Sequence, residues 1–329
     1  MKLLDLSNTA AREALATGTP VFLPVNPVEY HGPHLALRTD GLICAGLIRD
    51  LHAALTARHP GWPLVAVADL EAGVGPVPGP GSRAVPYEVV RGLVETACRA
   101  LADLGARRVI LMTFHGAPLH NLALDAGLRL LERRGVRAVA PFHLVLRRLI
   151  DGEGALFEDV FRGVKDPTER AGMIRDMGHD FHAGFLETSL ALHYAPKSVH
   201  PRYAELPPCP AVTPAAHFSA AARAARLLGQ RALAAELDFA AYAFGWHGLR
   251  PFPGYTGRPH RASREVGAFL ARRIVAEGAP VVLDVLEGRA DPIPPPMAWV
   301  GPLTLRGRFG PPLVPAAAIA TAALDRAPR

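Results

Sequence analysis

The chain has 329 residues, of which 50% are hydrophobic and 20% are charged, so it can bury a large core and is not intrinsically disordered. Its net charge of +6 comes from scattered arginines without a run of like charges, which argues against a dedicated nucleic-acid binder. Three widely spaced cysteines, Cys44, Cys98 and Cys209, form no CxxC pair, and no apolar run of about 18 residues occurs. We therefore expect a cytoplasmic protein without a secretion signal or a membrane span.

The first half of the chain alternates between strand-like apolar runs and segments with helical spacing. Predicted strands cover residues 21–25, 64–70, 107–114 and 136–144. Predicted helices cover residues 8–17, 41–58, 86–104 and 119–134, with Pro86 in a first turn and Gly105 as a terminator. This alternation predicts parallel strands with helices on both faces of the sheet.

The remaining segments are less regular. Residues 71–83 are rich in glycine and proline and are long for a structureless connection, which favours a binding loop. Residues 151–178 are polar and predict an irregular excursion over the surface, whereas residues 214–243 and 263–277 predict mainly helix. The end of the chain carries a proline-rich stretch, residues 292–296, and a basic, alanine-rich tail.

A candidate metal site follows the first predicted strand. Glu29 and His31 lie two residues apart, so in an extended segment their side chains point the same way and can converge on one ion. Asp40 stands at the start of the next predicted helix and is a third candidate ligand. An equally simple interpretation of Asp40 alone is that it caps this helix.

His115 and Gly116 follow the third predicted strand and reach its carboxyl end, as Glu29 does after the first. Glycine lets the backbone approach an ion or a substrate closely, and a histidine at a strand end is well placed to bind either. A lone histidine is nevertheless more often structural, so the proposal that His115 is a ligand depends on its partners.

A further polar segment, residues 179–189, leads into an apolar helical pattern. Its His182 and Glu187 are candidates for proton transfer and for binding or supporting a metal. The alternative is that the segment only caps the helix, through Asp180 or a nearby hydroxyl. Residues 254–260 are expected to form a loop before another helix start, and the remaining histidines are expected to be structural.

Five blocks of the chain, in order, resemble motifs of the creatininase family of metal-dependent amidohydrolases. Residues 29–40 resemble E-x-H-G-P-H-L-P-L-x-T-D, and Pro80-Gly81-Ser82 is similar to the family's P-G-T segment. His115-Gly116 resembles N-G-H-G-G-N, and residues 182–189 resemble H-A-G-x-x-E-T-S. Residues 257–267 are similar to G-D-P-x-x-A-T-x-E-x-G. The resemblance implies a three-layer α/β/α domain with a mostly parallel central sheet over residues 1–278, followed by a proline-rich extension, residues 279–329.

The same resemblance implies roles for individual residues. Glu29, Asp40 and His115 would hold one divalent metal, and His31 and Asp40 a second, so that Asp40 bridges two ions of zinc, manganese or iron. Creatinine-hydrolysing members complete the second site with a glutamate where this chain has Ala117. The second ion is therefore expected to be weak, completed by Glu187, or absent.

The expected reaction is hydrolysis of a C–N amide-type bond in a small-molecule substrate such as a cyclic amide, a formamide or a small peptide. A metal-bound hydroxide would attack the carbonyl, with His182 and Glu187 as catalytic residues and His182 moving a proton to the leaving nitrogen. The resemblance also implies a homo-oligomer, commonly a hexamer. The alternative is a catalytically impaired relative that binds a small molecule or a partner, because Ala117 replaces a ligand.

Overall fold

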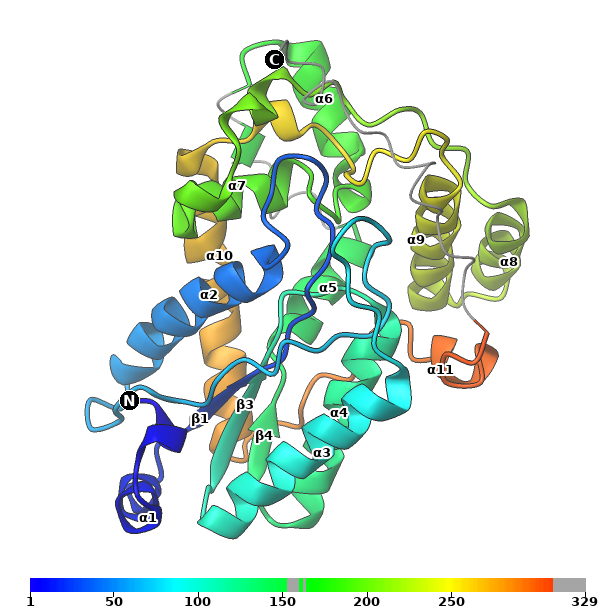
Figure 1. The fold of residues 1–329 in the computed structure, drawn as a ribbon. Coiled ribbons are helices and arrows are strands. Elements are labelled where there is room, and N and C mark those ends of the chain that lie inside the picture. Colours follow the sequence, from blue (N-terminus) through cyan, green and yellow to red (C-terminus); the bar gives the residue numbers. More distant parts are fainter. Residues whose placement is uncertain (153–159, 162–163, 310–329) are drawn as a thin grey trace.

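The computed structural model describes residues 1–152, 160–161 and 164–309, so the basic tail lies outside the described residues (Figure 1). At its centre is a parallel sheet with the strand order β2-β1-β3-β4. The strands are β1 (Val21–Pro24), β2 (Val65–Ala66), β3 (Arg108–Met112) and β4 (Arg137–Val139). Only Val65 and Ala66 of the predicted strand 64–70 enter the ladder, opposite Val21 and Phe22.

Helices cover both faces of the sheet and form three layers (Figure 1). One face packs against α1 (Asn8–Ala16), α3 (Tyr87–Leu104) and α4 (Pro118–Arg133). The other packs against α2 (Thr39–Thr56), α7 (Phe185–Tyr194) and α10 (Arg264–Leu286). Neighbouring side chains of β1 alternate between the two cores, with Val21 and Leu23 on the α3 side and Phe22 on the α2 side. The α/β/α prediction is confirmed.

Local sequence explains where α3 begins and ends. Its buried residues Val90, Val94, Cys98 and Leu101 recur at intervals of three and four, which places them on one face against the sheet. Gly105 ends the helix at a φ of 107°, a left-handed conformation that costs glycine little. Pro86 lies one position earlier than predicted, at the N-cap, where its missing N–H breaks no helical hydrogen bond.

The predicted strand over residues 136–144 is too long. The strand β4 ends at Val139, and the helix α5 (Phe142–Ile150) follows the turn at Pro141. The buried residues Phe142, Leu146 and Ile150 recur every four positions, so they form a helical stripe that the run of apolar letters concealed.

The segment predicted to be irregular, residues 151–178, contains the helix α6 (Pro167–Arg175). Its N-cap Asp166 accepts hydrogen bonds from the backbone N–H groups of Thr168 and Glu169, which stabilises the first turn. Part of this segment, residues 153–159 and 162–163, lies outside the described residues.

The predicted helical region 214–243 is two helices, α8 (Ala216–Leu227) and α9 (Arg231–His247), which pack side by side away from the sheet (Figure 1). The helix α10 continues past the predicted end through Pro280 to Leu286, and α11 (Val300–Leu303) is short. The helix α10 thus crosses position 278, where the sequence analysis ends the metal-enzyme domain and begins the proline-rich extension. That boundary stays a prediction. Short 3-10 helices complete the described part of the chain: Leu3–Asp5, Met177–His179, Pro196–Ser198, Pro201–Glu205 and Pro259–Arg261.

The strand order places a switch point between β1 and β3. From β1 the chain crosses through α2 to β2 on one face, and from β3 it crosses through α4 to β4 on the other face. Sheets of this kind bind ligands where the two loops leave in opposite directions at the strands' carboxyl ends. The predicted ligand-bearing loops leave at this point. None of the helices in the described residues combines the length and the apolarity needed to cross a bilayer.

Candidate metal centre

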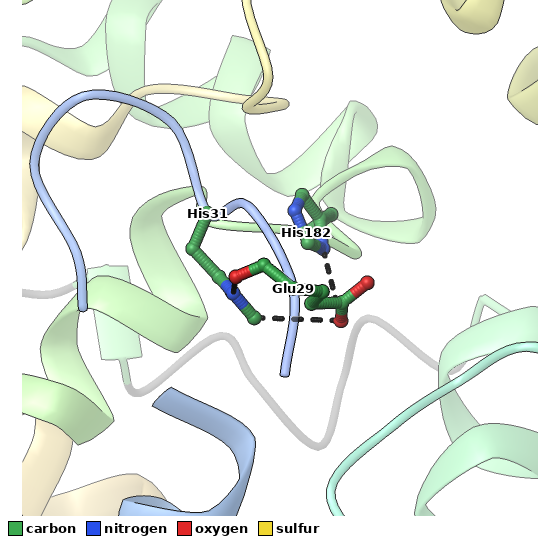
Figure 2. Close-up of side chains that lie close together, drawn as sticks. All are labelled: Glu29, His31 and His182. Atoms are coloured by element: carbon green, nitrogen blue, oxygen red, sulfur yellow. Dashed lines mark hydrogen bonds and ion pairs between the residues drawn. The ribbon is translucent and has the colours of Figure 1, made fainter. Parts of the chain in front are cut away.

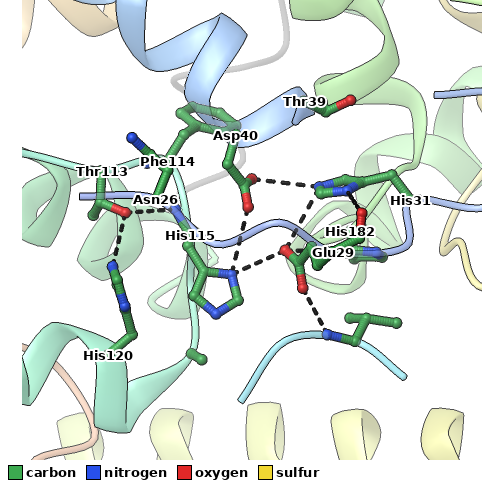
Figure 3. A network of polar contacts seen from close by, with 12 residues as sticks. Asn26, Glu29, His31, Thr39, Asp40, Thr113, Phe114, His115, His120 and His182 are labelled. Carbon is green, nitrogen blue, oxygen red and sulfur yellow. Dashed lines mark hydrogen bonds and ion pairs between the residues drawn. The ribbon is translucent and has the colours of Figure 1, made fainter. Parts of the chain in front are cut away.

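The loops after β1 and β3 are joined by hydrogen bonds that bring their polar side chains together (Figure 3). The N–H of Val25 donates to the carbonyl of Met112 over 2.8 Å, and the N–H of Phe114 donates to Oδ1 of Asn26 over 2.9 Å. The Asn26 amide also donates to Asp69, which follows β2, over 2.9 Å. Three strand ends are thus tied to one asparagine.

Glu29 lies at the centre of the cluster and is only 1% exposed. Its Oε2 accepts a hydrogen bond from the N–H of Val77 at 2.6 Å, and its Oε1 lies 3.0 Å from Nδ1 of His115. Val77 belongs to the glycine- and proline-rich loop after β2, and the same loop supplies the carbonyl of Val74 to Nε2 of His115 at 3.1 Å. The loop therefore positions two predicted ligands through its backbone.

His31 has one nitrogen fixed and one aimed into the cluster. Its Nδ1 donates to the carbonyl of Glu29 over 3.0 Å, because a carbonyl only accepts. Its Nε2 is buried without a hydrogen-bond partner and lies 3.4 Å from Oδ1 of Asp40, 3.4 Å from Oε1 of Glu187 and 3.6 Å from Oε1 of Glu29. A histidine held through one nitrogen and free at the other is arranged as metal-binding histidines usually are.

Asp40 is the second residue of α2, whose N-cap is Arg38, so the capping interpretation of Asp40 is wrong. Its carboxylate is buried between two imidazoles, with Oδ1 near His31 and Oδ2 3.7 Å from Nδ1 of His115 (Figure 3). Oδ2 has no hydrogen-bond partner. A buried charged oxygen without a partner is costly, which indicates that a cation belongs beside it.

His182 and Glu187 come from the segment that opens α7. Nε2 of His182 donates to the carbonyl of Tyr30 at 2.9 Å, and its Nδ1 lies 4.0 Å from Oε1 of Glu29 (Figure 2). Oε2 of Glu187 accepts from the N–H of Ala183 at 2.5 Å, which leaves Oε1 facing His31. Asp180 accepts hydrogen bonds from two N–H groups of the first turn of α7. The segment thus both caps a helix and delivers two side chains to the cluster.

All six predicted site residues therefore lie together. Their ligand atoms form three overlapping groups in which every atom is within 4.8 Å of the others: Glu29, Asp40 and His115; His31, Asp40 and Glu187; Glu29, His31 and His182.

Burial and neighbouring charges shift the pKa values of the cluster. Burial works to raise the pKa of Glu29, but the adjacent His115 and other imidazoles hold it well below its usual range. Burial, reinforced by the charge of Glu29, raises the pKa of Asp40. Burial opposes protonation of His31 and His115, but the carboxylates raise the pKa of both, that of His115 to about 9. The metal-free cluster thus balances its carboxylates with protonated imidazoles.

Sequence reasoning assigned structural roles to His120 and gave none to Asn121, yet both support His115. The amide of Asn121 donates to the carbonyl of His115 at 3.0 Å. Nε2 of His120 lies 3.1 Å from both the carbonyl of Val25 and Oγ1 of Thr113, and that hydroxyl accepts from the N–H of His115. In the sequence, their supporting role was indicated only by their position in the first turn of α4, a few residues after His115.

Other polar segments stay outside the cluster. His34 is buried but lies 2.9 Å from the hydroxyl of Thr188, and it belongs to none of the three groups. Ser263 caps α10 by accepting from the N–H of Val266, so the predicted loop and helix start after residue 254 are confirmed.

The donor set fits a divalent transition metal. Carboxylate oxygens and imidazole nitrogens suit zinc, manganese and iron, and two donor atoms, Nε2 of His31 and Oδ2 of Asp40, are buried without a hydrogen-bond partner. Ligand atoms around a tetrahedral ion with bonds of about 2.0–2.1 Å lie about 3.3 Å apart. The separations from His31 to Asp40 and to Glu187, both 3.4 Å, match this value.

Comparison with known proteins gives matches over most of the chain. A family model described as creatininase, creatinine amidohydrolase, matches residues 4–282. A mycofactocin precursor peptide peptidase from Mycobacterium ulcerans (strain Agy99) is 26% identical over 199 residues, which are 59% of this chain and 66% of the relative. The match thus spans just under two thirds of that peptidase.

Two solved structures show the same fold. A glutamate-to-glutamine mutant of creatininase, described as of the Zn-Zn type, is 21% identical with a TM-score of 0.52, covering 86% of this chain and 98% of that one. A putative creatinine amidohydrolase from Bacteroides fragilis NCTC 9343 is 18% identical with a TM-score of 0.54, covering 81% and 89%.

Proposed function

This chain belongs to the creatininase family, and from that premise we propose that it is a metal-dependent hydrolase that cleaves a C–N amide-type bond in a small molecule or a small peptide. The observation that carries the proposal is the buried group of Glu29, Asp40 and His115 at the switch point of the sheet. Two carboxylates and one imidazole would hold a divalent ion there. Such an ion supplies Lewis acidity, which polarises a carbonyl and makes water acidic enough to ionise near neutral pH.

His182 is proposed to move the proton. Burial lowers the pKa of His182, and the neighbouring His31 lowers it further, so the imidazole is neutral at pH 7. Because Nε2–H is held by the carbonyl of Tyr30, the basic nitrogen is Nδ1, which faces Glu29 and the cluster. Nδ1 can therefore accept a proton from the attacking water and pass it to the leaving nitrogen.

The substrate class rests on two supports. The family description names an amidohydrolase, and the mycobacterial relative is named a peptidase, so both act on C–N bonds. We also propose that the protein is a homo-oligomer, a hexamer by resemblance to the family. We further propose a cytoplasmic location, because the free thiols of Cys44, Cys98 and Cys209 suit a reducing compartment.

The test is metal analysis of protein purified without chelator, followed by a screen of small lactams, formamides and short peptides. We expect at least about one equivalent of transition metal per chain and amine release that stops when the metal is removed. Asp40→Asn is the matched inactive control. Less than about half an equivalent, not restored by zinc, manganese or iron, would instead support a non-catalytic binding protein.

A further inference from the structure

We propose that this protein binds a second metal ion through His31, Asp40 and Glu187, so that the first turn of α7 supplies the ligand that position 117 lacks. The proposal rests on the proposed function, because Asp40 would be shared with the ion held by Glu29 and His115. Ala117 precedes α4 as its N-cap and has no ligand atom. A third donor for the second ion must therefore come from elsewhere in the chain.

Glu187 has the geometry of that donor. Its Oε2 is held by the N–H of Ala183, and its Oε1 lies 3.4 Å from Nε2 of His31, close to the spacing of two ligands on one tetrahedral ion. Oδ1 of Asp40 lies at the same distance from that nitrogen. Glu187 is 7% exposed, and it forms an ion pair with His31, whose Nε2 has no hydrogen bond.

The competing group, Glu29, His31 and His182, is excluded by the orientation of its rings. The imidazoles of His31 and His182 are stacked, with their centroids 4.5 Å apart and their planes inclined by 28° (Figure 2). The lone pair of an imidazole nitrogen lies in the ring plane, so an ion about 2.0–2.1 Å from Nε2 of His31 would lie well outside the plane of His182. One ion cannot bind both rings well, which leaves His182 free to move protons.

Charge favours the same choice. The group with Glu187 brings a further carboxylate to the site in addition to the shared Asp40, whereas the competing group brings no carboxylate besides Glu29, which already belongs to the first ion's group. In addition, both carboxylate oxygens of Glu29 already have partners: Oε2 accepts a hydrogen bond from the N–H of Val77, and Oε1 lies 3.0 Å from Nδ1 of His115. In a site this deeply buried, an uncompensated positive charge is costly.

The experiment measures zinc stoichiometry and affinity on chelator-stripped protein by calorimetry and by elemental analysis after desalting. The wild type is expected to bind two zinc ions. Glu187→Gln should bind one, or bind the second at least about 100-fold more weakly, because a neutral amide is a poor ligand for zinc. Glu187→Asp keeps the charge but withdraws the oxygen, so it should weaken only the second ion, by about tenfold or more.

Two further variants make the result specific. Glu236→Gln is the matched control, since Glu236 is also 7% exposed, pairs with Arg147 and belongs to none of the three ligand groups. It should keep two ions, and so should His182→Gln. Two ions in Glu187→Gln, or one ion in His182→Gln, would overturn the proposal. A wild type that binds a single ion would overturn it while leaving the proposed function intact, whereas a wild type that binds none would contradict both.

Discussion

Binding of the first metal ion should release protons, because the imidazole that must bind it is protonated in the metal-free protein. Burial works against protonation of His115, but Glu29 and Asp40 raise its pKa to about 9. At pH 7, two units below this pKa, only about 1% of His115 is neutral, which weakens metal binding about 100-fold, or by about 2.7 kcal/mol. The pKa of His31 is also raised, so the second ion should release a further proton.

The assay is calorimetric titration of metal-free protein with zinc at pH 7 in buffers that differ in ionisation enthalpy. The observed enthalpy should change with the buffer, with a slope of about one proton or more per ion. At pH 9 only about half of His115 is protonated, so its contribution to the slope should fall by about half. Between pH 7 and pH 9 the affinity for the first zinc ion should rise roughly tenfold per pH unit. A proton lost from ionising water would persist at pH 9, so the decline shows that the proton comes from a ligand side chain and not from water.

His217→Asn, which removes an exposed histidine on α8, should leave the slope unchanged and serves as the control. Equal enthalpies in all buffers at pH 7 would refute the reasoning. The raised pKa also affects the stability of the metal-free protein. Folding raises the pKa of His115 from about 6.5, so its protonation stabilises the folded metal-free protein fully below that pH. This contribution is lost as the pH rises through about 9.

Three more predictions concern the reaction. Asp40→Asn should abolish metal-dependent activity while circular dichroism stays native, because Asp40 is not the helix cap; normal activity would remove Asp40 from the site. His182→Gln should slow turnover about 100-fold to 10,000-fold and flatten one limb of the pH–rate profile, and an unaltered profile with lower thermal stability would mark a packing residue. Creatinine should be a poor substrate because Phe114, which packs against Phe142, and Ala117 flank His115 without polar groups; turnover above about 10 per second would contradict this.

The sequence was sufficient to predict the layers and to bring the candidate ligands together at one edge of the sheet, because both depend on local patterns. The strand before Glu29 and the strand before His115 are both apolar runs, and parallel strands bring their carboxyl ends to one edge. The error over residues 136–144 had a local cause as well. The spacing of Phe142, Leu146 and Ile150 was helical, but a short apolar run resembles a strand until the turn at Pro141 is recognised.

What the sequence could not supply were the contacts between distant segments. The family resemblance offered Glu187 as one of three outcomes for the site of His31, but no spacing rule relates residues so far apart, and only the structure shows that α7 brings Glu187 to the loop after β1. The same holds for Asn26, which binds Asp69 and the N–H of Phe114. A histidine such as His120 is also ambiguous in sequence, because only its neighbours in space distinguish a supporting role from a packing role.

The order of the ligands along the chain has a consequence for biosynthesis. Glu29, His31, Asp40 and His115 all emerge from the ribosome before the last strand of the sheet ends at Val139, whereas Glu187 follows much later. Domains begin to fold from the N-terminus during synthesis. The first ion's ligands are thus complete in a growing chain that still lacks α7, and the second ion's are not. Metal loading should therefore be sequential, with the second ion acquired only when α7 docks against the nascent sheet.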